Sequence, residues 1–252
     1  VSKAGIYNNL AYLYHHTDQI EASLEPYEAA VKLYDELAEG EQVRQEYYYQ
    51  ASSLTNMGSA LGQLGRTDEA LEHFASSVGM LEAAMEKRPD NRMLLQYLFE
   101  SYVRRSEMLD KSREYNKAKS DLEKAIALPL GKNPFVDLSR LRLLAMNVSL
   151  GSIQPSVEKA VELVQGKSSD FYLEAAIVAA RAAAHFLDDE TQPAEEREES
   201  VKRYATLAAS LIVEAMEKNE FMHINPSIVP TRSSNKRLWD RAEYAAVRQL
   251  FK

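Results

Sequence analysis

The chain has 252 residues, of which 45% are hydrophobic, and it contains 9 glycines and no cysteine. The lack of cysteine excludes disulfides, thiol chemistry and cysteine-ligated zinc. A formal net charge of −8 argues against a nucleic-acid surface, which needs a basic footprint. No apolar run approaches the roughly 20 residues of a membrane span, so no membrane insertion is expected, and the dominant Ala, Leu, Glu and Lys favour an all-α chain.

The first predicted unit covers residues 5–34, with a turn signal at residues 16–18 between two helices. In its second helix, the small residue Ser23 is followed four positions later by Tyr27 and seven positions later by the small residue Ala30. Close helix crossings require small residues, and a large side chain one turn away fills the space beside them. This spacing therefore predicts an antiparallel helical hairpin.

The same spacing recurs twice. Ala70 lies 47 residues after Ser23, and Ala118 lies 48 residues after Ala70. Each is followed four positions later by a large apolar residue, Phe74 or Leu122. A self-similar period in this range indicates stacked helical repeats.

Two segments carry a family resemblance. Residues 56–78 (NMGSALGQLGRTDEALEHFASSV) and 113–128 (REYNKAKSDLEKAIAL) closely resemble tetratricopeptide repeats, and residues 5–34 resemble them more loosely. The resemblance implies three hairpins over residues 1–130, stacked in an all-α right-handed superhelix whose first helices line a concave wall.

The chain departs from the minimal repeat in three ways. Pro26 falls inside an expected second helix, which should kink there or begin late. Arg105 stands where a large apolar residue is usual. The interval also exceeds the roughly 34 residues of a minimal unit, so long helices are expected over residues 67–88 and 91–112, separated by residues 89–91.

Beyond residue 130 the repeat pattern fades, and residues 131–252 are expected to hold degenerate repeats and a C-terminal capping helix. The predicted elements are two helices over 135–165 with a turn at Gly151, an alanine-rich helix over 170–187 that packs on more than one side, and its partner from Pro193 to about Asn219. An acidic insert covers residues 188–199. Carboxylates at a helix start complement the helix dipole, and this role is favoured over metal binding.

The long units also resemble regions found C-terminal to the catalytic domain in many serine/threonine protein kinases of planctomycete-type bacteria. The segments that carry this resemblance are 32–42 (KLYDELAEGEQ), 79–91 (GMLEAAMEKRPDN), 170–183 (DFYLEAAIVAARAA), 203–221 (RYATLAASLIVEAMEKNEF) and 238–251 (LWDRAEYAAVRQLF). Because the chain begins at Val1 rather than Met, we expect it to be an excised part of a longer protein. The resemblance implies that a kinase domain is attached upstream.

No catalytic role is predicted for this segment. The sequence has no G-x-G-x-x-G, H-R-D, D-F-G or G-x-S-x-G motif. His15 and His16 are adjacent, so on a helix they diverge by roughly 100° and cannot easily share one metal ion. No cofactor and no metal are therefore expected.

Function is expected on the surface of the first helices, because such surfaces bind extended peptides or helices. The inward positions implied by the resemblance are Asn8, Tyr12, His15 and His16 in the first unit, Ser52, Thr55, Asn56, Ser59 and Gln63 in the second, and Glu100, Arg104 and Glu107 in the third. The predicted partner is a protein or peptide.

A cochaperone-type clamp for a terminal carboxylate is not expected. The resemblance implies Lys, Asn and Arg at set inward positions, and Asn56 and Arg104 match. Asn8 and Tyr12 stand in place of Lys and Asn, and Glu100 in place of a second Lys. The acidic side chain would repel the ligand.

Residues 47–49 are three consecutive tyrosines, which cannot all enter one core face because neighbours on a helix point about 100° apart. At least one should reach the surface or an adjoining unit, and packing against the preceding hairpin is favoured. Two alternatives to a peptide-binding module stay open: a regulatory or substrate-docking lobe acting on an attached kinase domain, and a self-associating scaffold. The sequence leaves the compartment open between the cytoplasm and a soluble domain of a membrane-attached protein.

Overall fold

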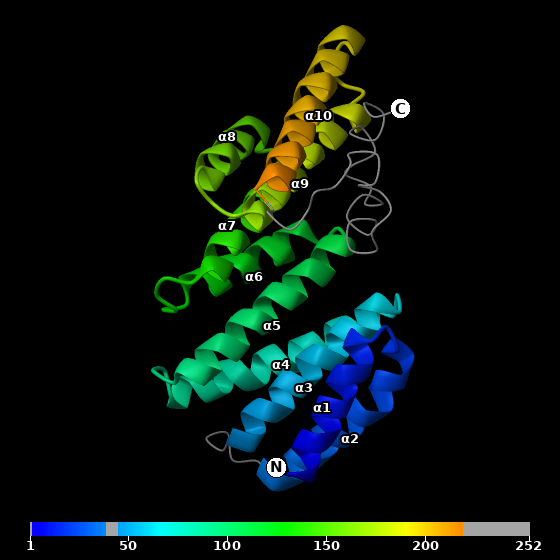
Figure 1. Ribbon diagram of the computed structural model, residues 1–252, viewed down its shortest axis with the longest axis vertical. Helices are drawn as coiled ribbons and strands as arrows, with labels where there is room; N and C mark the ends of the chain where they lie inside the picture. Colours follow the sequence, from blue (N-terminus) through cyan, green and yellow to red (C-terminus); the bar gives the residue numbers. More distant parts are fainter. Residues whose placement is uncertain (1, 39–44, 219–252) are drawn as a thin grey trace. The chain divides into compact units, whose positions relative to one another are not determined.

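The computed structural model describes residues 2–38 and 45–218, and these ranges contain ten α-helices and no strand (Figure 1). The helices are α1 Lys3–His16, α2 Ile20–Ala38, α3 Gln45–Gln63, α4 Thr67–Lys87, α5 Arg92–Lys111, α6 Tyr115–Ala127, α7 Pro134–Ser149, α8 Ile153–Val164, α9 Ser169–Asp188 and α10 Ala194–Glu217. The predicted all-α fold is thus confirmed. Contacts divide the chain into two units, Val1–Val136 and Asp137–Lys252.

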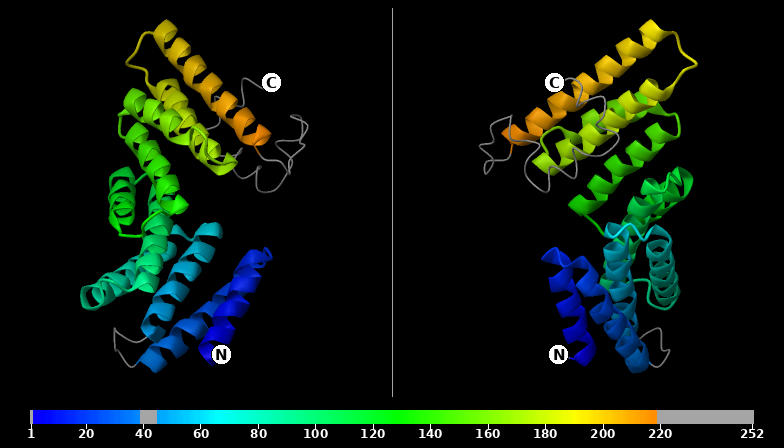
Figure 2. Two further views of the ribbon diagram at one scale, coloured as in Figure 1. Left: turned by 60° about the vertical axis from the view of Figure 1, so that its left-hand side comes forward. Right: turned by 90° about the vertical axis from the view of Figure 1, so that its right-hand side faces the viewer.

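The first unit consists of three helical hairpins. Helix α1 pairs with α2, α3 with α4 and α5 with α6, and the contacts of α2 with α3 and of α4 with α5 join successive hairpins. The paired helices run antiparallel, as the two views in Figure 2 show. The first helices also contact one another, α1 with α3 and α3 with α5, so they form one layer.

Local signals set the helix ends of this unit. The Asn91 side chain accepts hydrogen bonds from the backbone N–H groups of Met93 and Leu94 at 3.0 and 3.1 Å, which starts α5 at the predicted break. After α3, Gly65 adopts a φ of 77°, a conformation that glycine reaches without a steric penalty. The long helices predicted for residues 67–88 and 91–112 are therefore present within one residue at each end.

Pro26 does not delay α2. The helix begins at Ile20 and continues through Pro26, so the late start considered from the sequence is wrong. Pro26 is buried, whereas Ala22, whose carbonyl lacks its usual N–H partner, is an exposed residue where water can take that place. The Pro26 ring is therefore buried, while the backbone hydrogen bond that it cannot form is lost on the solvent-exposed side of the helix.

The small residues of the repeat lie at the helix crossings. Ser23, Ala70 and Ala118 are each 0% exposed, and the large residues that follow them are also buried, Tyr27, Phe74 and Leu122. Gly58 on α3 faces the same crossing: a Cβ placed there would lie 3.1 Å from the carbonyl oxygen of Ala70. The packing register predicted from the spacing is confirmed.

Three buried hydroxyl groups connect α3, α4 and α5. Thr55 Oγ1 lies 2.8 Å from Ser77 Oγ and 2.7 Å from Ser101 Oγ. Ser77 also donates to the carbonyl of Ala51 at 2.7 Å, and Ser101 to that of Tyr97 at 2.9 Å. All three hydroxyl-bearing residues are nearly inaccessible, so their polar groups are satisfied within the core.

Arg105, which departs from the repeat pattern, pairs α5 with α6. Its Nε and Nη2 donate to the two carboxylate oxygens of Asp121, both at 2.6 Å. The Asp121 side chain is 5% exposed, so the bidentate geometry compensates the burial of its charge. Another polar contact links α4 to both of these helices, because Tyr102 of α5 and Lys124 of α6 both donate to the Glu82 carboxylate of α4.

The second unit is centred on the alanine-rich α9. This helix contacts both α8 and α10, which confirms that it packs on more than one side. Its buried alanines are Ala175, Ala176, Ala179, Ala180, Ala182 and Ala183. Arg142 on α7 donates to Glu174 on α9 at 3.1 Å, and Phe186 stacks on Tyr204 of α10. The predicted C-terminal capping helix lies outside the described residues.

Ala70→Leu and Ala118→Leu should each destabilise the chain by about 1–3 kcal/mol, because a larger side chain cannot enter a closely packed crossing without displacing its neighbours. Ala75→Leu is the matched control, since Ala75 lies on α4 but is exposed. Urea unfolding followed by circular dichroism measures the effect. Equal midpoints for all three variants would contradict the assigned packing.

Thr55→Val should also lower the free energy of unfolding by about 1–3 kcal/mol, because it preserves the side-chain shape while removing the hydroxyl that Ser77 and Ser101 share. The partly exposed Ser59 provides the comparison, and Ser59→Ala should cost less than Thr55→Val in the same unfolding experiment. A Thr55→Val variant as stable as the parent would show that the buried hydroxyl contacts contribute nothing.

Candidate functional site

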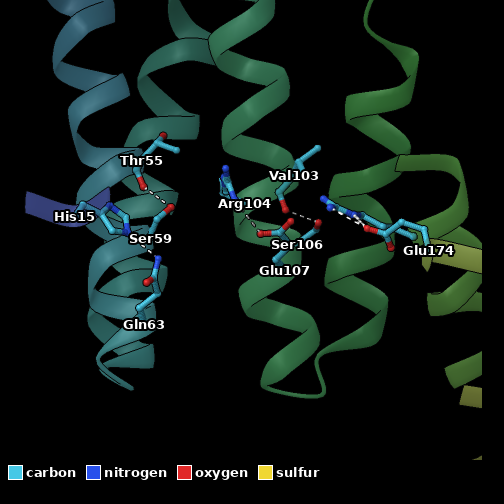
Figure 3. Close-up of polar contacts among 10 residues, drawn as sticks. His15, Thr55, Ser59, Gln63, Val103, Arg104, Ser106, Glu107 and Glu174 are labelled. Carbon is cyan, nitrogen blue, oxygen red and sulfur yellow. Dashed lines mark hydrogen bonds and ion pairs between the residues drawn. The ribbon is translucent and has the colours of Figure 1, made fainter. Parts of the chain in front are cut away.

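The candidate site is the layer formed by α1, α3 and α5. Figure 3 shows that His15 from α1, Ser59 and Gln63 from α3, and Arg104 and Glu107 from α5 lie along this layer. Many apolar side chains of α3 and α5 are buried in hairpin contacts, whereas α1 also exposes Ile6, Leu10, Tyr12 and Leu13. The layer also offers hydrogen-bonding groups at helical intervals.

One polar contact across the layer joins α1 to α3. The Nε2 atoms of His15 and Gln63 lie 2.6 Å apart. If the amide nitrogen of Gln63 donates, His15 must be neutral, with its proton on Nδ1. The His15 ring also meets the buried Tyr27 ring edge-on, with centroids 6.4 Å apart. His15 thus sits between the core and the surface.

The electrostatic surroundings of His15 favour its neutral form. Burial, and then the positive charges of His16 and Arg104, lower the pKa of His15 below its ordinary value of 6.5. His15 of α1 and Arg104 of α5 both lie along the layer (Figure 3). Arg104 itself is about half exposed and contacts Glu107 at 3.5 Å.

Tyr12 and His16 are exposed and pair with each other. Their rings stack with centroids 3.8 Å apart, and His16 Nδ1 lies 3.0 Å from the carbonyl oxygen of Tyr12. This stack forms an aromatic plate at the end of α1. The two histidines face different neighbours, as their adjacency predicts.

The remaining predicted positions differ in accessibility. Thr55 is 3% exposed and belongs to the buried hydroxyl network, so its side chain cannot reach a partner. Asn8 accepts a hydrogen bond from Ser53 at 2.8 Å, and Ser59 donates to the carbonyl of Thr55 at 3.1 Å. The Ser53–Asn8 bond joins α3 to α1, whereas the Ser59 bond lies within α3.

Three predicted residues are left with unused polar groups. Ser52 and Asn56 are partly exposed and make no side-chain hydrogen bond within residues 2–38 and 45–218. Glu100 is exposed and has no ion pair in the same ranges. Asn56 and Arg104, on adjacent first helices, therefore present an amide and a guanidinium at the surface.

A cavity of about 400 Å³ lies away from this polar set, among α4, α5 and α6. Leu71, Ala75 and Leu109 contribute its apolar wall. Its charged lining residues already have partners: Arg105 with Asp121, Lys117 with Glu114, and Lys124 with Glu82. Sequence reasoning missed the cavity, although the unusual Arg105 was the signal that pointed there.

The described residues show no metal site and no membrane span. Within 2–38 and 45–218, no three His, Asp or Glu side chains are grouped so that they could hold an ion. No helix in that part of the chain is long and apolar enough to cross a membrane.

Comparisons with known proteins identify the repeats. Residues 4–38 and 50–90 match one tetratricopeptide repeat model, and residues 99–129 match a second. The fold is similar to the crystal structure of Podosopora anserina putative kinesin light chain nearly identical TPR-like repeats, with a TM-score of 0.54 and 17% identity over 81% of this chain and 94% of that one. A point variant of that same repeat protein matches with the same score and identity, over 81% and 93%. No curated protein matches.

The folded chain should lose stability as the pH falls through the ordinary His15 pKa. Because the folded-state pKa is lowered, the unfolded chain binds the proton first, and folding must release it. His15→Gln keeps a polar side chain without this titration, so its unfolding free energy should depend less on pH between about 8 and 5.5. Urea unfolding at a series of pH values measures this. Parallel profiles for parent and variant would contradict the prediction.

Proposed function

Because tetratricopeptide repeat models match residues 4–38, 50–90 and 99–129, we propose that this chain is a non-catalytic module that binds a protein or peptide partner on the layer of α1, α3 and α5. Such repeats mediate protein–protein interaction. One observation carries the choice of surface: Asn56 and Arg104 lie on neighbouring first helices, and neither side chain is used by the core.

The available groups suit an extended backbone. The Asn56 amide can both donate and accept, which matches the alternating N–H and C=O groups of a peptide. Among the described residues, the Arg104 guanidinium is held by a single ion pair, the 3.5 Å contact with Glu107, so it can turn to a backbone carbonyl of the partner. Gln63 and His15 supply a further polar pair.

The proposed surface is not expected to bind the C-terminal carboxylate of a partner. Glu100 lies four residues before Arg104 on α5, and its exposed carboxylate has no cationic partner in the described part of the chain. A ligand carboxylate placed beside Arg104 would meet this negative charge. The partner is therefore expected to use internal residues of its chain rather than its C-terminus.

Attachment to a serine/threonine kinase is a finer proposal that rests on the resemblance of the long units to C-terminal kinase regions. In that setting the layer would recruit a substrate or act on the catalytic domain. If a kinase domain accompanies these repeats in the full reading frame, deleting residues 1–252 should change phosphorylation of a recruited protein more than of a generic peptide.

The binding surface is tested by replacing Asn56 and Arg104 together with Ala. Both are polar residues outside the core, so the double variant should keep the helical content and lose no more than about 1 kcal/mol of stability. Proteins from a lysate of the source organism are recovered on the immobilised chain and identified by mass spectrometry. Specific partners of the parent should be depleted with the double variant.

The matched control is Asn116→Ala with Lys119→Ala, which removes an amide and a cation from α6 instead. This control should recover the same partners as the parent. Unchanged recovery with the Asn56 and Arg104 double variant would show that the first-helix layer is not the binding surface.

A further inference from the structure

Two glutamate–tyrosine pairs lie in the first halves of α3 and α5. Glu46 and Tyr49 are three residues apart on α3, and Tyr97 and Glu100 are three residues apart on α5. Residues at this separation are neighbours on one helix face. Since α3 and α5 contact each other, the two pairs adjoin in the first-helix layer.

The tyrosine rings bring the pairs together. Tyr49 and Tyr97 meet edge to face with centroids 6.4 Å apart, and Tyr34 of α2 lies 5.6 Å from Tyr49. Tyr49 and Tyr97 are only partly buried, while Tyr34 is 5% exposed. Two ring surfaces therefore reach the solvent on a fixed aromatic base. We call Tyr49, Tyr97, Glu46 and Glu100 the tyrosine–glutamate surface.

The carboxylates of Glu46 and Glu100 have no cationic partner in the part of the chain that the structure describes. Neither the Glu46 nor the Glu100 side chain forms an ion pair or hydrogen bond with another residue in 2–38 and 45–218. Both carboxylates lie close enough to affect the tyrosine hydroxyl groups. The pKa values of Tyr34 and Tyr97 are raised mainly by burial and next by Tyr49; Glu46 raises the pKa of Tyr34 further, and Glu100 raises that of Tyr97. Two negative charges and two aromatic rings are thus presented together, with no compensating cation paired to them within 2–38 and 45–218.

We propose that the tyrosine–glutamate surface binds an arginine or lysine side chain of a basic segment in the partner protein. A cation over a tyrosine ring is attracted by the π-electrons, and the flanking carboxylates add charge complementarity. The same layer already shows such a contact, since Lys3 Nζ lies 5.9 Å from the centroid of the Tyr7 ring. The net charge of −8 favours approach of a basic segment.

This inference rests on the proposed function and adds the chemistry and direction of the partner. Glu100 lies one helical turn before Arg104 on α5, so negative and positive groups follow one another along the layer. A partner whose basic residue meets Tyr97 and Glu100 would place a backbone carbonyl beside Arg104, where a second basic residue would be repelled. The partner segment is therefore expected to be basic at one end only.

The test uses a fluorescein-labelled hexa-arginine peptide and the full chain, with binding followed by fluorescence anisotropy at low salt. Glu46→Gln with Glu100→Gln should weaken binding about tenfold. Glu25→Gln with Glu28→Gln is the matched control: it removes the same charge from exposed positions of α2 and should change the affinity by less than about twofold.

Tyrosine variants separate the aromatic contribution. Tyr97→Phe keeps the ring and should bind like the parent, whereas Tyr97→Leu should bind more weakly while circular dichroism confirms its helical content. If hexa-arginine fails to bind, or if both glutamine double variants weaken it equally, the proposal is wrong. Neither result bears on partner recovery with the Asn56 and Arg104 variant, which tests the proposed function separately.

Discussion

The close crossing of helices at small residues is the constraint on which the first unit depends. Where Ser23, Ala70 and Ala118 stand, the facing backbone approaches so nearly that even the Cβ of an added alanine at Gly58 would crowd a carbonyl oxygen. Small residues at these points allow the two helices of a hairpin to pack this closely. The layer of first helices, and every polar group on it, is positioned as a consequence of that packing.

The hairpins can be predicted from the sequence because they follow from local rules. Spacing of small and large residues, caps such as Asn91 and the turn at Gly65 are each read within a few positions. Pro26 is harder to interpret, since a proline in a helix is tolerated where the freed carbonyl faces water and the ring is buried. That balance depends on the surrounding structure rather than on the residue alone.

The site is less predictable for the same reason. Repeat positions indicate which side chains leave the crossings, but not which of them find a partner on the next helix. Thr55 occupies a surface position of the repeat pattern and yet lies in the core, because Ser77 and Ser101 from two other helices meet its hydroxyl. Arg105 is an anomaly in the sequence, and only the position of Asp121 opposite it explains the charge. Both outcomes arise from residues far apart in the chain.

The hydrogen bonds among the three buried hydroxyl groups also limit how far the helices can slide past one another. Apolar side chains allow helices to slide by small amounts, since dispersion contacts have no preferred direction, whereas hydrogen bonds between Thr55, Ser77 and Ser101 hold at one alignment only. These hydrogen bonds hold α3, α4 and α5 in one relative alignment. Asn56 directly follows Thr55 in sequence, and Arg104 lies about one helical turn after Ser101. The hydrogen bonds that align the helices therefore also set the separation between the backbone positions of Asn56 and Arg104.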